Sequence, residues 1–169
     1  MRERIAALRP QDGVIGEEFP STDSRSGFTW VLDPIDGTRA FIIGAPTWGS
    51  LAALSDAQGP LLGAISLPAL GERYLGAGRR AGGFAEWRRG DERRRLATRR
   101  CARLADAILS TTYPEVGDAA ETAAFARVRA GVRMTRYGLD CTAYALLAAG
   151  HIDLVIEAGL QPHDICAPI

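Results

Sequence analysis

The sequence of 169 residues contains no lysine, so its only basic side chains besides two histidines are twenty arginines. A P-loop nucleotide site needs its lysine on the phosphates, and Schiff-base enzymes need a lysine amine, so both classes are excluded. Cysteine is scarce as well. Cys101, Cys141 and Cys166 are far apart and show no metal-ligand spacing, which argues against both a disulfide framework and a zinc site.

Net charge and long apolar runs are missing too. Twenty acidic residues balance the arginines, so the chain as a whole has no attraction for nucleic acid or an anionic membrane. No window is typical of a spanning helix, and the N-terminus leads into no signal-like stretch. With 47% hydrophobic residues, the length suits one core, and we expect a single cytoplasmic domain over residues 1–169.

Apolar periodicity and turn residues predict alternating helices and strands. Helices are expected over residues 1–9, 118–130 and 142–149. Strands are expected over 14–16, 28–32 and 107–113, near 47–55, 61–67, 72–77 and 83–87, and over 132–137 and 154–157. The four middle segments, with Gly and Pro between them, suggest an antiparallel sheet. The mixture predicts an α/β protein with an α+β layered sandwich.

Residues 79–103 hold ten arginines and only three acidic residues, on a predicted hairpin or loop. A nucleic-acid or anion-binding module is one interpretation of this segment. Phe84 and Trp87 are the only interleaved aromatic residues, and no known reader motif is present. A solvated variable loop is therefore the favoured interpretation, and nucleic acid is not expected as a partner.

The run from Asp33 to Thr38, with sequence DPIDGT, places two carboxylates three residues apart. Asp33 follows a strongly predicted strand, Pro34 fixes φ, and Asp36 with Gly37 favours a tight turn. Such an all-oxygen shell suits magnesium, and the backbone N–H groups after the turn suit a phosphate. Taken alone, the run could also be a surface turn between two strands.

Three segments together resemble the inositol monophosphatase superfamily of metal-dependent phosphatases. They are Gly16-Glu17-Glu18, the run from Trp30 to Thr38, and Asp164 late in the chain. The resemblance implies an inositol-monophosphatase or sugar-phosphatase-like fold that is incomplete at both ends. It also implies hydrolysis of a small phosphate monoester by a metal-activated water, with two or three Mg²⁺ ions.

The resemblance also implies roles for individual residues. The implied metal ligands are the carboxylates of four residues and one backbone carbonyl, from Glu17, Asp33, Asp36, Asp164 and Ile35. Gly37 and Thr38 match the turn that contacts phosphate. Glu17 and Thr38 match the pair that orients and deprotonates the attacking water, and Asp33 is taken as catalytic with them.

Several further segments resemble the histidinol-phosphatase branch of the superfamily; they are residues 36–41, 44–49, 138–141, 143–150 and 153–164. The implied substrate contacts are Asp36, Asp140, Glu157 and Asp164. Acids at 140 and 157 favour the ammonium and imidazole of histidinol phosphate over a neutral inositol ring. Asp140 could instead cap the following helix, whereas a lone buried Glu157 is harder to explain structurally.

Other functions stay open at this point. Within the enzyme class they are an inositol-1-phosphate phosphatase and a nucleotide or sugar bisphosphatase. Outside it, they are an inactive truncated homologue that pairs with a complete subunit, and the nucleic-acid binder described above. A homodimer is suggested only by the resemblance.

Overall fold

The computed structural model describes all of residues 1–169 and contains two separate β-sheets. The larger sheet has seven strands in the order of the chain: β1 (Gly13–Gly16), β2 (Thr29–Asp36), β3 (Gly49–Asp56), β4 (Gly59–Leu67), β5 (Glu72–Ala77), β6 (Phe84–Arg89) and β7 (Glu92–Arg95). β1 pairs with β2 in parallel, and every later neighbour pairs antiparallel. The larger sheet is therefore mainly an antiparallel meander, as the sequence predicts.

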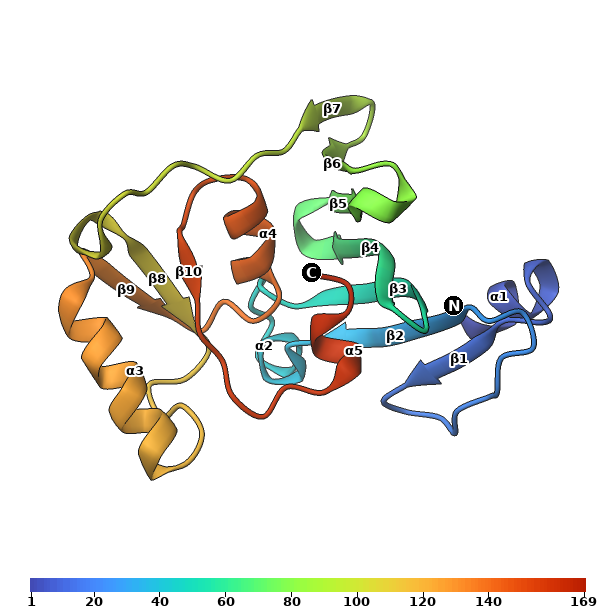
Figure 1. Cartoon of the computed structure of the whole chain (residues 1–169), viewed down its shortest axis with the longest axis horizontal. Coiled ribbons are helices and arrows are strands. Elements are labelled where there is room, and N and C mark those ends of the chain that lie inside the picture. Colours follow the sequence, from blue (N-terminus) through green and yellow to red (C-terminus); the bar gives the residue numbers. More distant parts are fainter.

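The smaller sheet is parallel and is made by the second half of the chain. Its strands have the order β10 (Leu154–Val155), β8 (Ile108–Thr111) and β9 (Met134–Tyr137). Figure 1 shows α3 (Ala119–Gly131) outside this sheet, with α4 (Thr142–Ala148) and α5 (Pro162–Ile165) between the two sheets. The remaining helices are α1 (Arg2–Leu8) and α2 (Thr38–Ile42), and short 3₁₀ turns cover Pro68–Leu70, Arg79–Ala81 and Leu104–Asp106. The predicted layered α/β architecture is confirmed.

The main core lies between the larger sheet and the layer formed by α4 and the C-terminal segment. Leu51 and Leu67 are fully buried there, and Ala145 of α4 packs against the same cluster. A smaller cluster of Leu109, Val116 and Phe125 joins α3 to the second sheet. Because α4 contributes to the main core and is followed by β10, packing fixes the two sheets relative to each other.

Most element boundaries agree with the sequence prediction to within a few residues, and three differ in an informative way. The predicted helix over residues 1–9 forms, but none of its residues is buried, so its expected apolar face covers no core. The expected strand over 154–157 keeps only Leu154 and Val155, and the strand over 132–137 starts at Met134. None of the helices combines the length and the apolar character required to cross a membrane.

Candidate metal centre

A β-bulge at the end of β2 brings Asp33 and Asp36 to the same side of the sheet. Asp33 pairs with Leu51 of β3, but Asp36 pairs with Gly49, so β2 contains one extra residue between the two pairs. Side chains of a regular strand alternate, and residues three apart would face opposite sides. The extra residue restores a common direction. Pro34 tolerates this position because it has no N–H to donate, and its carbonyl accepts the Ser50 hydroxyl at 2.7 Å.

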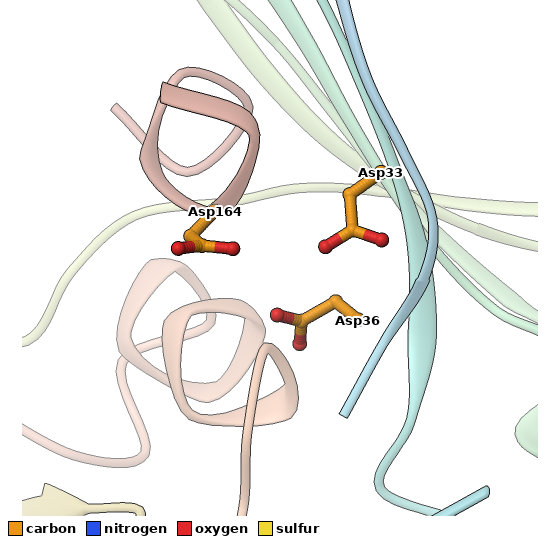
Figure 2. Close-up of side chains that lie close together, drawn as sticks. All are labelled: Asp33, Asp36 and Asp164. Carbon is orange, nitrogen blue, oxygen red and sulfur yellow. The ribbon is translucent and has the colours of Figure 1, made fainter. Parts of the chain in front are cut away.

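Asp164 of α5 completes a group of three carboxylates. One oxygen from each of Asp33, Asp36 and Asp164 lies within 4.8 Å of the other two. Figure 2 shows the Asp164 carboxylate reaching from α5 toward the two acids at the end of β2. The structure thus brings together residues separated by more than 120 positions in the sequence.

Each of the three side chains is held by hydrogen bonds to the backbone. Asp33 accepts the Ile35 N–H at 3.0 Å, and Asp36 accepts the Cys141 N–H at 2.8 Å. Asp164 accepts the N–H of Gln161 at 2.7 Å, within a capping box at the start of α5. These bonds leave further lone pairs on every carboxylate, because each ionised group can accept about four hydrogen bonds or ligands.

The crowding of these acids changes their protonation. Burial raises the pKa of Asp33 to about 7, and the charges of Asp36 and Glu17 add to this effect. Burial also raises the pKa of Asp36, and the charge of Asp164 contributes. No arginine forms an ion pair with any of the three; the only such contact is His163 Nε2, 3.5 Å from Asp164. The cluster therefore carries negative charge that no arginine balances.

This donor set fits a hard divalent cation. Magnesium prefers oxygen ligands and typically takes a few carboxylates together with water and substrate oxygens. Three carboxylate oxygens in one place, from rigid segments and with spare lone pairs, match that preference. A cation there would also offset the charges of Asp36 and Glu17, which add to the effect of burial on the pKa of Asp33.

The other predicted metal and phosphate residues surround this trio. Glu17 follows β1 directly alongside Asp33, because Gly16 pairs with Leu32. Its side chain is exposed and lies outside the three-carboxylate group, although its charge reaches Asp33. The Ile35 carbonyl accepts the Thr38 hydroxyl at 3.2 Å. The assignment of Glu17 and Ile35 as ligands remains a prediction.

Gly37 forms the turn between β2 and α2 with a left-handed backbone, at φ 77°. A Cβ atom at this position would come within 3.0 Å of the Asp140 side chain, so both conformation and space require glycine. Thr38 begins α2, where the first N–H groups have no partner within the helix. The predicted phosphate turn thus lies directly against Asp140.

Asp140 does not cap α4, so that alternative is wrong. The residue at the N-cap of α4 is Cys141, with no side-chain cap, and the Asp140 carboxylate accepts the Thr47 hydroxyl at 3.4 Å. Asp140 is also the one non-glycine residue with positive φ, at 45°. Burial raises its pKa, and the charge of Asp36 adds to the effect. This strained, half-buried acid lies against the Gly37 turn, one residue before Cys141, whose N–H donates to Asp36.

Glu157 has more partners than the sequence indicates. Its carboxylate accepts the N–H of Thr112 at 2.8 Å, the Thr112 hydroxyl at 2.9 Å and the Thr111 hydroxyl at 3.4 Å. The expectation of a lone buried acid is therefore wrong, because Glu157 also ties its segment to the end of β8. Burial still raises its pKa, and the charge of Asp140 contributes.

Sequence reasoning overlooks several residues that shape the site. Burial raises the pKa of the Tyr144 hydroxyl on α4, and the charges of Glu157, Asp36 and Asp164 add to it. The Arg39 guanidinium lies 5.1 Å from the ring centre of Tyr113. This contact joins α2 to the loop after β8. These contacts depend on tertiary packing, and no local pattern marks them.

Comparison with known proteins agrees with this geometry. The profile of the inositol monophosphatase family matches residues 1–169, the whole chain. The chain belongs to the inositol monophosphatase family. Its fold matches the solved structure of an inositol monophosphatase from Zymomonas mobilis with a TM-score of 0.86 and 38% identity, covering 99% of this chain and 62% of that one.

Two curated relatives carry different names within the family. The bifunctional phosphatase IMPL2, chloroplastic, of Arabidopsis thaliana is 43% identical over 94% of this chain and 44% of its own length. The histidinol-phosphatase of Mycobacterium tuberculosis is 35% identical over 99% of this chain and 64% of its own length. The chain therefore spans about half to two thirds of these relatives, while matching them along nearly its whole length.

Proposed function

We propose that this protein hydrolyses a small phosphate monoester with divalent magnesium held by Asp33, Asp36 and Asp164. The observation that carries the proposal is the convergence of three carboxylate oxygens within 4.8 Å, without an arginine to balance them. Family membership supports the same chemistry, and Glu17 beside Asp33 is a candidate for a further ligand. The proposal extends to the Ile35 carbonyl, which would ligate through its second lone pair.

The residues around the trio have separate tasks in this proposal. A bound divalent cation would neutralise the ester's phosphate and lower the pKa of the attacking water. The N–H groups at Gly37 and Thr38 would donate hydrogen bonds to the phosphate oxygens. Glu17, exposed and next to Asp33, would accept the proton of the water, with the Thr38 hydroxyl orienting that water. The water oxygen would then bond to phosphorus and the ester P–O bond would break. The leaving alkoxide would take a proton from solvent, and Glu17 would return its proton to solvent.

The preferred substrate in this proposal is L-histidinol phosphate, as in histidine biosynthesis. Asp140 lies against Gly37 of the phosphate turn, and its charge reaches Glu157, so two acids would lie near the alcohol group of a substrate bound there. Acids favour a substrate whose alcohol carries an ammonium and an imidazole. The histidinol-phosphatase among the relatives supports this substrate.

Inositol 1-phosphate is the second candidate. The structural relative from Zymomonas mobilis, at 38% identity, is named an inositol monophosphatase. Asp140 accepts a hydroxyl hydrogen bond from Thr47 at 3.4 Å, and in the same way it could accept one from a sugar hydroxyl. The acids therefore do not exclude an inositol substrate by geometry, and the choice between the two rests on charge.

The test compares phosphate release from L-histidinol phosphate and from inositol 1-phosphate at equal concentrations with Mg²⁺, and with EDTA as a control. The proposal expects EDTA-sensitive release, with the larger kcat/KM on histidinol phosphate. Equal or greater activity on inositol phosphate would contradict the substrate assignment alone. Activity that is unaffected by EDTA would contradict the metal-dependent mechanism.

A further inference from the structure

Strand β7 forms one edge of the larger sheet and is exposed along its whole length. It pairs only with β6, and no strand follows it in the sheet order. All four of its residues, Glu92 to Arg95, are exposed. Figure 1 shows β7 at the outer end of the larger sheet, away from the helices between the sheets. Its outer backbone groups are therefore open to another strand.

The hydrogen-bond pattern shows which backbone groups are free. The N–H of Leu96 donates to the carbonyl of Ala85 at 2.8 Å, so residues 96, 94 and 92 bond inward to β6. By the alternation of an antiparallel ladder, the N–H and C=O groups of Arg93 and Arg95 point outward. The free edge thus offers two donors and two acceptors, spaced about 7 Å apart.

The two residues with outward backbone groups, Arg93 and Arg95, also carry side chains that form no ion pair. Arg93 pairs across the ladder with Arg88, and Arg88 pairs with Arg73 on β5, so three arginines form a row on one face. Like charges directly opposite each other are destabilising. Arg88 contacts Glu86, but none of the three arginines of β7 forms an ion pair. This row has a charge that an acidic strand would balance.

Two other occupants fit this edge poorly. A second copy of β7 would place arginine against arginine along the new ladder, and so would repel. Single-stranded nucleic acid binds by stacking its bases on aromatic rings. Trp87 is buried beneath Arg94, whose guanidinium lies 4.1 Å from the ring centre, and Phe84 is the only exposed aromatic side chain of the hairpin. The edge lacks a stacking surface for bases.

We propose that β7 binds an extended acidic segment of a partner protein by adding it as a further strand. The partner backbone bonds to Arg93 and Arg95, and its alternate carboxylates lie beside the side chains of these two residues on one face. Apolar side chains at the intervening positions lie on the face of Arg94. This interaction does not involve the carboxylate cluster and is independent of the proposed phosphatase activity.

The direct test measures the binding of a fluorescein-labelled peptide that alternates glutamate with valine, by fluorescence anisotropy on the whole protein. The control peptide has the same composition with its glutamates grouped together. The alternating peptide is expected to bind at least about fivefold more tightly, because only its carboxylates match the two-residue spacing of the strand. Equal binding of both peptides would overturn the proposal, because it would show that the arginines attract acidic peptides only as a diffuse positive surface.

Two variants separate backbone pairing from charge. Arg93→Pro removes an outward N–H without removing an inward one, and proline is tolerated on the free side of an edge strand. It should weaken binding about tenfold, while Arg93→Lys, which keeps both the charge and the N–H, should stay within about twofold. Unchanged binding in Arg93→Pro, or tighter binding of a single-stranded DNA oligonucleotide that is unaffected by this variant, would overturn the proposal.

A second variant keeps the test decisive if Arg93→Pro fails to fold. Reversing the charges with Arg93→Glu and Arg95→Glu should transfer preference to a peptide that alternates arginine with valine. Phosphate release, if present in the wild type, should be unchanged in the same sample, which also shows that the variant is folded. If the variant still prefers the glutamate peptide, β7 does not select its partner by the charge at alternate positions, and the proposal is wrong.

Discussion

The protein has two regions of concentrated like charge, and they are built in opposite ways. The acidic trio gathers Asp33, Asp36 and Asp164 from two distant segments into one partly buried place. The arginines of β7 are neighbours in the sequence and lie along an exposed edge. Water screens the arginines, whereas burial raises the pKa of Asp33 to about 7. We therefore propose different roles for the two regions: a cation site for the acidic trio, and a contact with a partner protein for the arginine edge.

The largest expected effect comes from breaking the acidic trio. Asp33→Asn should reduce magnesium-dependent phosphate release by roughly a thousandfold or more, because the cation loses a ligand and a charge. A suitable control is Asp106→Asn, since Asp106 is exposed and bonded to Arg103 at 2.7 Å on the protein surface. Steady-state phosphate release would measure both. Similar activity in the two variants would show that catalysis does not require the Asp33 carboxylate.

A smaller and more selective effect is expected at Glu157. Glu157→Gln keeps an oxygen that can accept from Thr112 but removes the charge. KM for L-histidinol phosphate should rise about tenfold, while KM for inositol 1-phosphate should change by less than about twofold. The measurement is the pair of KM values. An equal rise for both substrates would mean that Glu157 acts by holding the Thr112 turn.

Protonation should link the acidic trio to stability when no metal is bound. An ordinary aspartate has a pKa near 3.8, and Asp33 has a pKa of about 7 in the folded protein. Between these values the folded protein binds a proton that the unfolded chain releases, so the free energy of unfolding falls as pH rises from about 4 to 7. The Tm in EDTA should drop by on the order of 5 °C between pH 5 and pH 8.

Two further measurements check this pH dependence. Asp33→Asn should reduce the dependence in EDTA, because the amide does not titrate, while the raised pKa values of Asp36, Asp140 and Glu157 should preserve part of it. Magnesium should raise the Tm more at pH 8 than at pH 5, since the ionised carboxylate is the ligand. If the Tm of Asp33→Asn changes with pH as much as that of the wild type, the pH dependence arises from another group.

The smallest expected effect concerns the arginine edge. Arg93→Thr removes one member of the row with Arg88 and Arg73, and should raise the free energy of unfolding by about 0.5 kcal/mol. Arg95→Thr is the matched control, because Arg95 lies opposite Glu86 and its loss should give no gain. Urea unfolding would measure both. A loss of stability in Arg93→Thr would show that the row is not a source of repulsion.

The sequence predicts the longer helices and most of the strands of this fold, because apolar alternation and turn residues act locally. It does not predict the short elements α2, α5 and β7. It ends the strand at Leu32, whereas β2 continues through Asp36 and contains Asp33. It does not reveal the bulge that turns Asp33 and Asp36 the same way, since the register with Leu51 and Gly49 depends on the neighbouring strand. The likeness to a family, rather than any local signal, identifies Asp164 as a third acid.

Two interpretations of single residues were wrong for the same reason. A helix cap was one of two alternatives for Asp140, beside a substrate contact, and Glu157 was expected to lack structural partners. The structure places Thr47 beside Asp140, and Thr112 beside Glu157, from segments 93 and 45 residues away. Hydrogen-bond partners at such separations leave no mark on the local sequence, so the surroundings of the substrate acids could not be predicted.

Calorimetric titration of the metal-free protein with Mg²⁺ and Mn²⁺ tests the central claim most directly. Saturable binding should occur at pH 8 and should weaken by at least about tenfold in both Asp33→Asn and Asp164→Asn, while Asp106→Asn binds like the wild type. Binding that is absent from the wild type, or that survives unchanged in both cluster variants, would contradict the assignment of these acids as a cation site.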